Sequence, residues 1–156
     1  MNRIKLLMLA VLAIFVSVSV GMAAEKTFKA KLAGRESVPT VQTKASGDAE
    51  FKLSKDGKQL DYKLTVKDIE NVTAAHIHLG KKGENGPPVA GIFAGPKKTG
   101  KFKGVLAEGV ITDKDLMGDF QGKGLDALVK EIKAGNTFVN VHTDAHPDGE
   151  IRGQIK

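Results

Sequence analysis

Hydrophobic and polar residues alternate with a period of two along much of the chain, in short segments. The segment 27–33 places Phe28, Ala30 and Leu32 on one face and polar residues on the other, and segments 47–54 and 59–66 repeat the pattern. Such alternation is typical of strands that bury one face. Glycine, proline, asparagine and aspartate separate the segments, so the sequence predicts an all-β, antiparallel Greek-key sandwich or barrel.

The connections between these segments differ in length. Asp56-Gly57 predicts a tight hairpin turn, because both residues tolerate positive φ. Residues 80–104 are rich in glycine, proline and lysine and are expected to form mainly a long loop, with one short strand at 89–93. The remaining strands are predicted at 72–79, 105–112, 137–143 and 150–155.

One segment has a helical rather than a strand period. Leu125, Leu128, Val129 and Ile132 follow the spacing i, i+3, i+4 and i+7, and Gly135 stands where a helix would end. We therefore expect one short helix that caps an end of the sandwich.

The N-terminal segment has the order of a secretory signal. Arg3 and Lys5 precede an apolar run over residues 6–20, and small residues follow up to Ala24. This order predicts a signal peptide over residues 1–24, a secreted or periplasmic protein, and no stable membrane span after cleavage. A retained anchor is the alternative, but the run is short for a span of about 20 residues. Residues 25–156 are enough for one domain with its own core.

Charge and cysteine content narrow the classes of partner. The formal net charge of +6 falls to +4 once Arg3 and Lys5 leave with the signal, and the lysines are scattered. With one tyrosine and no tryptophan to stack on bases, the sequence favours a solvated charged surface over a nucleic-acid-binding protein. The chain has no cysteine, so a bound metal must be held by nitrogen and oxygen.

All four histidines lie in two short motifs. His76 and His78 fall on the same face of the strand predicted at 72–79, and His142 lies on a later strand with His146 in the turn that follows. A single histidine on a strand is usually a surface or hydrogen-bonded residue, but the pairing of two such motifs predicts one joint metal site. Imidazole ligands without thiolate favour copper, with zinc as the alternative.

Three carboxylates lie close to the second motif in the sequence. Asp144, Asp148 and Glu150 are candidates for acceptors that orient the imidazole N–H groups. An equally good interpretation makes each of them an ordinary turn or surface residue.

Two separated motifs resemble a known family. Residues 75–78 (AHIH) and 83–87 (GENGP), followed by 135–143 (GNTFVNVHT) and 147–155 (PDGEIRGQI), resemble the chordin-type (CHRD) domain over about residues 26–156. This resemblance implies an extracellular β-sandwich whose biochemical role is poorly defined.

A second resemblance bears on chemistry. Copper superoxide dismutases also have a His-x-His strand, a late Val-His strand and an arginine near the C-terminus. The resemblance implies that His76, His78 and His142 are copper ligands and that Arg152 guides an anion. The sandwich is expected to be immunoglobulin-like or superoxide dismutase-like. The chain lacks a bridging histidine, a zinc-ligand cluster and a disulfide, so such an enzyme would be copper-only.

Two functional hypotheses follow. In the first, a copper centre disproportionates superoxide, and Arg152 attracts the anion together with four lysines, namely Lys81, Lys82, Lys97 and Lys98. In the second, the protein is a non-catalytic metal-binding or protein-interaction module. For Arg152, a structural ion pair with Asp148 or Glu150 is the alternative role.

Overall fold

The computed structural model describes residues 25–156, and the predicted signal peptide at residues 1–24 lies outside the described residues. The described chain contains seven strands, one α-helix and three short 3-10 helices. In chain order they are β1 (Lys26–Ala33), η1 (Gly34–Glu36), β2 (Ser46–Leu53), β3 (Leu60–Leu79), β4 (Pro88–Phe93), β5 (Lys98–Ile111), η2 (Asp113–Asp115), η3 (Gly118–Phe120), α1 (Leu125–Lys133), β6 (Thr137–Thr143) and β7 (Ile151–Gln154).

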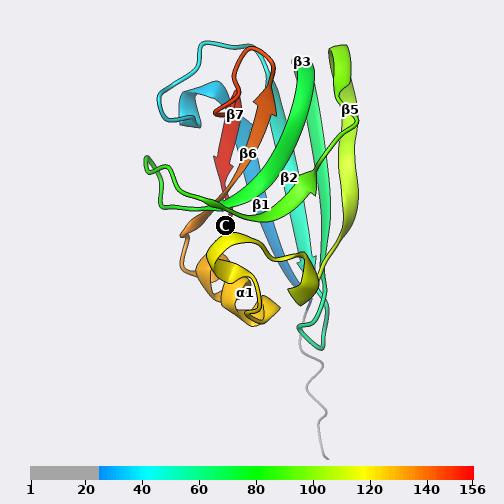
Figure 1. Cartoon of the computed structure of the whole chain (residues 1–156), viewed down its shortest axis with the longest axis vertical. Coiled ribbons are helices and arrows are strands. Elements are labelled where there is room, and N and C mark those ends of the chain that lie inside the picture. Colours follow the sequence, from blue (N-terminus) through cyan, green and yellow to red (C-terminus); the bar gives the residue numbers. More distant parts are fainter. Residues whose placement is uncertain (1–24) are drawn as a thin grey trace, which may run out of the picture.

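The strands form one antiparallel sheet that closes into a barrel (Figure 1). Its order is β2-β1-β7-β6-β3-β4, and β3 also pairs with β2 and β5. The closure arises because β3 contacts β2 along its first half and β6 along its second half. The prediction of an all-β antiparallel sandwich or barrel with one short helix is confirmed.

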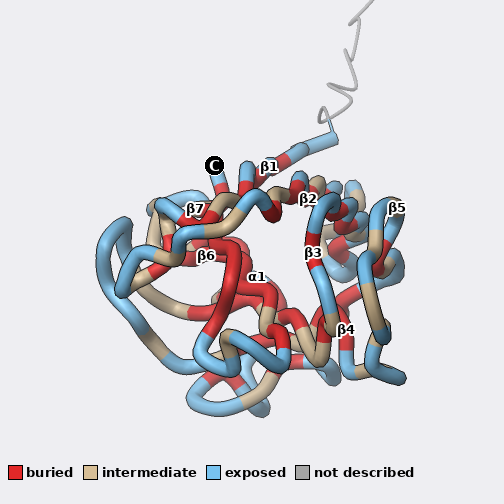
Figure 2. The backbone as a smooth tube through the Cα atoms, turned by 90° about the horizontal axis from the view of Figure 1, so that it is seen from above, coloured by how far each residue is buried: buried red, intermediate tan, exposed pale blue. Residues whose placement is uncertain are grey.

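The hydrophobic core fills the barrel, and α1 covers one end of it. Alternate residues of β1 are buried, and the view from above shows the buried positions gathered toward the inside of the ring of strands (Figure 2). Four apolar residues of α1 face this core: Leu125, Leu128, Val129 and Ile132. Gly135, at φ 74°, follows the helix, as its position in the sequence predicted. Within residues 25–156, no helix has the length and apolar character needed to cross a membrane.

The strand β3 is longer than predicted. Segments 59–66 and 72–79 were expected to be separate, but the structure has one bent strand of 20 residues. Asp68 and Asn71 have positive φ values of 53° and 52°, and the pairing register with β5 shifts on either side of Ile69. Aspartate and asparagine enter this backbone region more easily than most residues, so the strand changes direction here without ending.

The region predicted to be a long loop is also more regular than expected. The short strand at its centre is confirmed as β4, but β5 begins at Lys98 rather than at Val105. Residues 98–105 of β5 are exposed or half-buried throughout, so they lack the apolar alternation by which the other strands were recognised. The true connection between β3 and β4 is residues 80–87, and we call this segment the site loop.

Candidate metal centre

Three histidines from two neighbouring strands meet on the outer face of the barrel. His76 and His78 lie on the second half of β3, and His142 lies on β6, which pairs with that half. Ile77 and Val141 are fully buried in the core on the opposite face. The strand alternation puts His76 and His78 on one face, as the sequence predicted, and separates the imidazoles from the core. The β3–β6 register then brings the three rings together.

The three rings form a compact triangle. Ring centroids lie 5.3 Å apart for His76 and His142, 5.7 Å for His76 and His78, and 5.7 Å for His78 and His142. One nitrogen from each ring can be chosen so that all three lie within 4.8 Å of one another. This spacing is compatible with one metal ion held by three imidazoles. His78 is 8% exposed, and the other two are half-buried.

Hydrogen bonds determine which nitrogens of His78 and His142 are free. Nδ1 of His78 lies 2.8 Å from the carbonyl oxygen of Gly86, and Nδ1 of His142 lies 2.8 Å from that of Pro147. A carbonyl only accepts, so each Nδ1 carries the proton, and each neutral ring has its lone pair on Nε2. Nε2 of His142 faces Nδ1 of His76 at 3.3 Å.

The free nitrogen of His78 has no partner. Nε2 of His78 is buried and makes no hydrogen bond within the described part of the chain. Buried polar atoms are nearly always paired, so an unpaired lone pair beside two other imidazoles needs an explanation. A metal-ligand role is compatible with this free nitrogen, and the residues present fit a metal ion bound by one nitrogen of each of the three rings, with Nε2 as the free nitrogen of His78.

The imidazoles on β3 favour the neutral form that a metal requires. Burial lowers the pKa of His76 to about 4, and repulsion from His142 and His78 acts in the same direction. Burial likewise lowers the pKa of His78, against the opposing effect of its hydrogen bond to Gly86. At neutral pH both rings are neutral rather than cationic, so a metal ion does not compete with the second proton of an imidazolium.

This pKa shift predicts a loss of stability in acid for the metal-free protein. His76 titrates near 6.5 when unfolded and at about 4 when folded, so the unfolded state binds more protons between these values. The free energy of unfolding should therefore fall as the pH drops from about 6.5 to about 4. Urea unfolding at about pH 7, 5.5 and 4.5 measures this free energy of unfolding. A His76→Gln variant should lose less stability over this range, and an unchanged pH dependence would contradict the assignment.

His146 is not part of the triangle. Its carbonyl oxygen accepts a hydrogen bond from the Thr143 backbone N–H, and its own N–H points back toward Thr143, so it closes the turn after β6. Among the described residues, the metal-compatible group contains only His76, His78 and His142. The predicted fourth ligand is thus placed outside the group that the fold assembles.

The carboxylates near the second motif have other partners. Glu150 is buried and accepts hydrogen bonds from the hydroxyls of Thr43 and Thr143, at 2.6 and 2.8 Å. Asp144 pairs with Lys97 at 2.8 Å. The imidazole N–H groups of His78 and His142 instead meet the carbonyls of Gly86 and Pro147. The sequence did not predict these two acceptors, because every residue carries a backbone carbonyl and none stands out. The one available signal was that Gly86 and Pro147 both lie in segments with turn-forming residues.

Arg152 is buried beside the site rather than displayed to solvent. It is 2% exposed, and its guanidinium carbon lies 3.5 Å from the centroid of the Phe138 ring. Nη2 donates to the carbonyl of Lys81 at 2.8 Å, and Nη1 donates to Oδ1 of Asn85 at 3.4 Å. Within residues 25–156, no carboxylate lies within ion-pair distance of Arg152. Its contacts are therefore to the site loop, and anion guidance stays a prediction.

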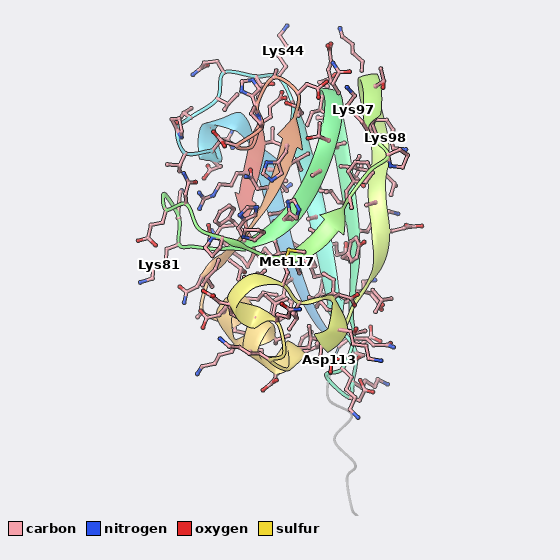
Figure 3. The ribbon with its side chains drawn as sticks, in the orientation of Figure 1. Lys44, Lys81, Lys97, Lys98, Asp113 and Met117 are labelled. Carbon is pink, nitrogen blue, oxygen red and sulfur yellow. The ribbon has the colours of Figure 1, made fainter. Side chains whose placement is uncertain are left out.

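The four lysines expected to attract an anion do not gather at one place. Figure 3 shows Lys81 at one side of the molecule and Lys97 and Lys98 at the opposite side. Lys97 is paired with Asp144, and Lys82 lies 3.7 Å from Glu36. These charges do not form a single basic funnel over the histidines.

A comparison with known families agrees with this arrangement. The CHRD domain family model matches residues 28–155, which include the three histidines of the triangle and nearly every strand residue. The chain belongs to the CHRD domain family. Chordin from Xenopus laevis is 30% identical over 132 aligned residues, which cover 80% of this chain and 12% of chordin. The CHRD domain described here thus spans a small part of that relative's length. No solved structure matches the chain.

Proposed function

We propose that this CHRD-domain protein binds one copper ion through His76, His78 and His142. The buried, unpaired Nε2 of His78 carries the proposal, because it lies near two further imidazoles and has no hydrogen-bond partner within residues 25–156. The site is preorganised: two of the three rings are already oriented by backbone carbonyls, so little ordering is left for the metal to induce.

The donor set favours copper and leaves zinc as the rival. Three neutral imidazoles suit Cu(II) and Zn(II) alike, and affinities for divalent metals rise to copper before falling to zinc. Zinc commonly uses three histidines and one water in sites that keep an open position. Competition between the two ions for the same protein measures the preference, and tighter binding of zinc would overturn the choice of copper.

Metal content is the direct test. Protein loaded with copper and then freed of excess metal should retain about one equivalent per chain by elemental analysis. A chain that retains none after loading with copper or zinc contradicts the proposal. In that case the histidines only hydrogen-bond the ends of the sheet.

Superoxide dismutation is the activity that we propose for the loaded protein. Three protein ligands leave a coordination position free, and bound copper would supply the one-electron chemistry that dismutation of superoxide requires. His76 and His142 are only half-buried, so solvent reaches these two residues. Stopped-flow decay of superoxide tests this: copper-loaded protein should be faster than metal-free protein, and an equal rate contradicts catalysis without contradicting metal binding.

A non-catalytic module is the second candidate, and the match to chordin favours it. Chordin is much longer than this chain, and only 12% of it aligns, so the shared domain acts there as one part of a larger protein. Such a module would hold the metal for storage, for delivery or for structure. If azide or another small anion leaves the absorption spectrum of the bound copper unchanged, no coordination position is open, and this candidate is favoured over the enzyme.

Export is proposed from the N-terminal pattern alone. Residues 1–24 have the order of a cleaved signal, which would place the domain in the periplasm or outside the cell. Mass spectrometry of the protein from an extracellular or periplasmic fraction should find a chain that begins at Ala24 or Glu25.

A further inference from the structure

We infer that Asn85 and Arg152 are positioning residues for the metal centre: they hold the site loop so that the Gly86 carbonyl keeps His78 in the tautomer that can bind a metal. This inference rests on the proposed metal site. It assigns Arg152 a role through the loop, where the sequence had suggested a role toward an anion.

The ends and the tip of the site loop are held differently. At its ends, Leu79 N–H donates to the carbonyl of Pro87 at 3.0 Å, and Gly80 N–H donates to that of Asn136 at 2.8 Å. At its tip, side chains connect the loop to the rest of the fold. Arg152 donates to the Lys81 carbonyl and to Asn85, and Asn85 in turn donates to the Val38 carbonyl at 2.8 Å. These two side chains, together with the exposed Lys82–Glu36 ion pair at 3.7 Å, therefore hold the tip in position.

The same arginine is connected to His78 through an aromatic ring. Phe138 on β6 lies directly opposite His78 on β3, and Arg152 on β7 lies on the other side of β6. The His78 and Phe138 rings stack with centroids 5.1 Å apart and an interplanar angle of 17°. The guanidinium contacts the same Phe138 ring. His78, Phe138 and Arg152 therefore form a row across three strands, covered by the site loop.

Gly86 brings its carbonyl to His78 by a very close approach. A Cβ atom at Gly86 would overlap the backbone oxygen of Leu79, so only glycine fits where the loop folds back on the end of β3. The Gly86 carbonyl then accepts a hydrogen bond from the Nδ1–H of His78. The ligand-capable Nε2 is free for as long as this hydrogen bond holds the proton on Nδ1.

Release of the tip would change the chemistry of His78. Without a carbonyl at Nδ1, the proton of a neutral imidazole can move to Nε2, where it blocks the metal-binding lone pair. Outer partners that orient ligating histidines typically change metal affinity by 10–100-fold when they are removed. Asn85 is exposed, so its loss should act on the loop and leave the core intact.

The test uses the full chain with Asn85→Ala, Arg152→Lys and a control in the same loop, Lys81→Ala, which keeps the backbone carbonyl and removes an exposed side chain that has no hydrogen-bond or ion-pair partner among the described residues. Long-range ¹H–¹⁵N NMR of the metal-free protein reports the His78 tautomer, and competition titration gives the affinity for copper. Asn85→Ala should populate the Nε2–H form and weaken copper binding about tenfold, whereas Lys81→Ala should change neither quantity. Arg152→Lys keeps the charge but cannot hold Lys81 and Asn85 together, so it should resemble Asn85→Ala.

Each outcome is decisive. If Asn85→Ala keeps the parent tautomer and affinity, the positioning role is wrong, whether or not Arg152→Lys folds. If the parent protein binds no copper, the proposed function fails, and the tautomer of His78 in metal-free Asn85→Ala still decides the positioning role.

Discussion

Replacing His78 with leucine is expected to abolish stoichiometric copper binding and to leave the metal-free fold intact. The substitution removes one of three ligands, so the loss of affinity should exceed the roughly 100-fold upper range for outer partners. It also removes the buried Nε2, which has no hydrogen-bond partner among the described residues, but it leaves the Gly86 carbonyl without its Nδ1–H donor. Leaving such an acceptor unpaired costs about 1–3 kcal/mol, so the free energy of unfolding of the metal-free variant should fall by no more than about 3 kcal/mol.

The measurements are copper competition and urea unfolding, with His146→Gln as the matched control. His146 comes from the same pair of motifs but lies outside the triangle, so its replacement should leave copper affinity unchanged. Parent-like copper binding by His78→Leu would refute the ligand assignment. A loss of binding in His146→Gln would show that the turn after β6 supplies a fourth ligand.

Replacing Phe138 with alanine is expected to have the largest effect on stability near the site. Phe138 is 1% exposed and separates His78 from Arg152. Truncation of a buried phenylalanine costs about 3–5 kcal/mol, a large part of the 5–15 kcal/mol that is usual for a whole domain. Because His78 would also lose the ring on which it stacks, copper affinity of the folded variant should fall.

Phe51→Ala is the control that separates the two effects. Phe51 is fully buried in the barrel core, so its truncation should destabilise the protein by a similar amount. Its side chain lies in the barrel core, whereas the histidines lie on the outer face of β3 and β6. The copper affinity of folded Phe51→Ala should therefore stay at the parent value. Equal copper affinities for both variants would show that Phe138 contributes to stability alone.

The histidine triangle illustrates how a candidate site is built on a fold without disturbing its core. The strands β3 and β6 bury Ile77 and Val141 on one face and present the histidines on the other. The outer face then needs its own cover, which the site loop and the turn after β6 supply through the carbonyls of Gly86 and Pro147. The unpaired nitrogen of His78 is a local defect in hydrogen bonding, and such defects are expected where a site serves function.

Local patterns in the sequence were sufficient for several features. The period of two predicted β1 and β2, and the Asp56-Gly57 pair predicted the hairpin that joins β2 to β3. The period of 3.6 predicted α1 with its buried face. The same alternation put His76 and His78 on one side of a strand, away from Ile77. These features depend on residues close together in the chain, so neighbouring side chains are enough to determine them.

Other features depended on the tertiary structure. The register between β3 and β6 decided that His142, and not His146, approaches His76, at 3.3 Å. The closed barrel also decided that Arg152 faces the site loop, and that backbone carbonyls orient the imidazoles where carboxylates were expected. Strand register joins residues far apart in the chain, and a carbonyl is common to every residue. The register and the choice of acceptor carbonyl therefore cannot be predicted from neighbouring residues in the sequence, and only the folded chain shows them.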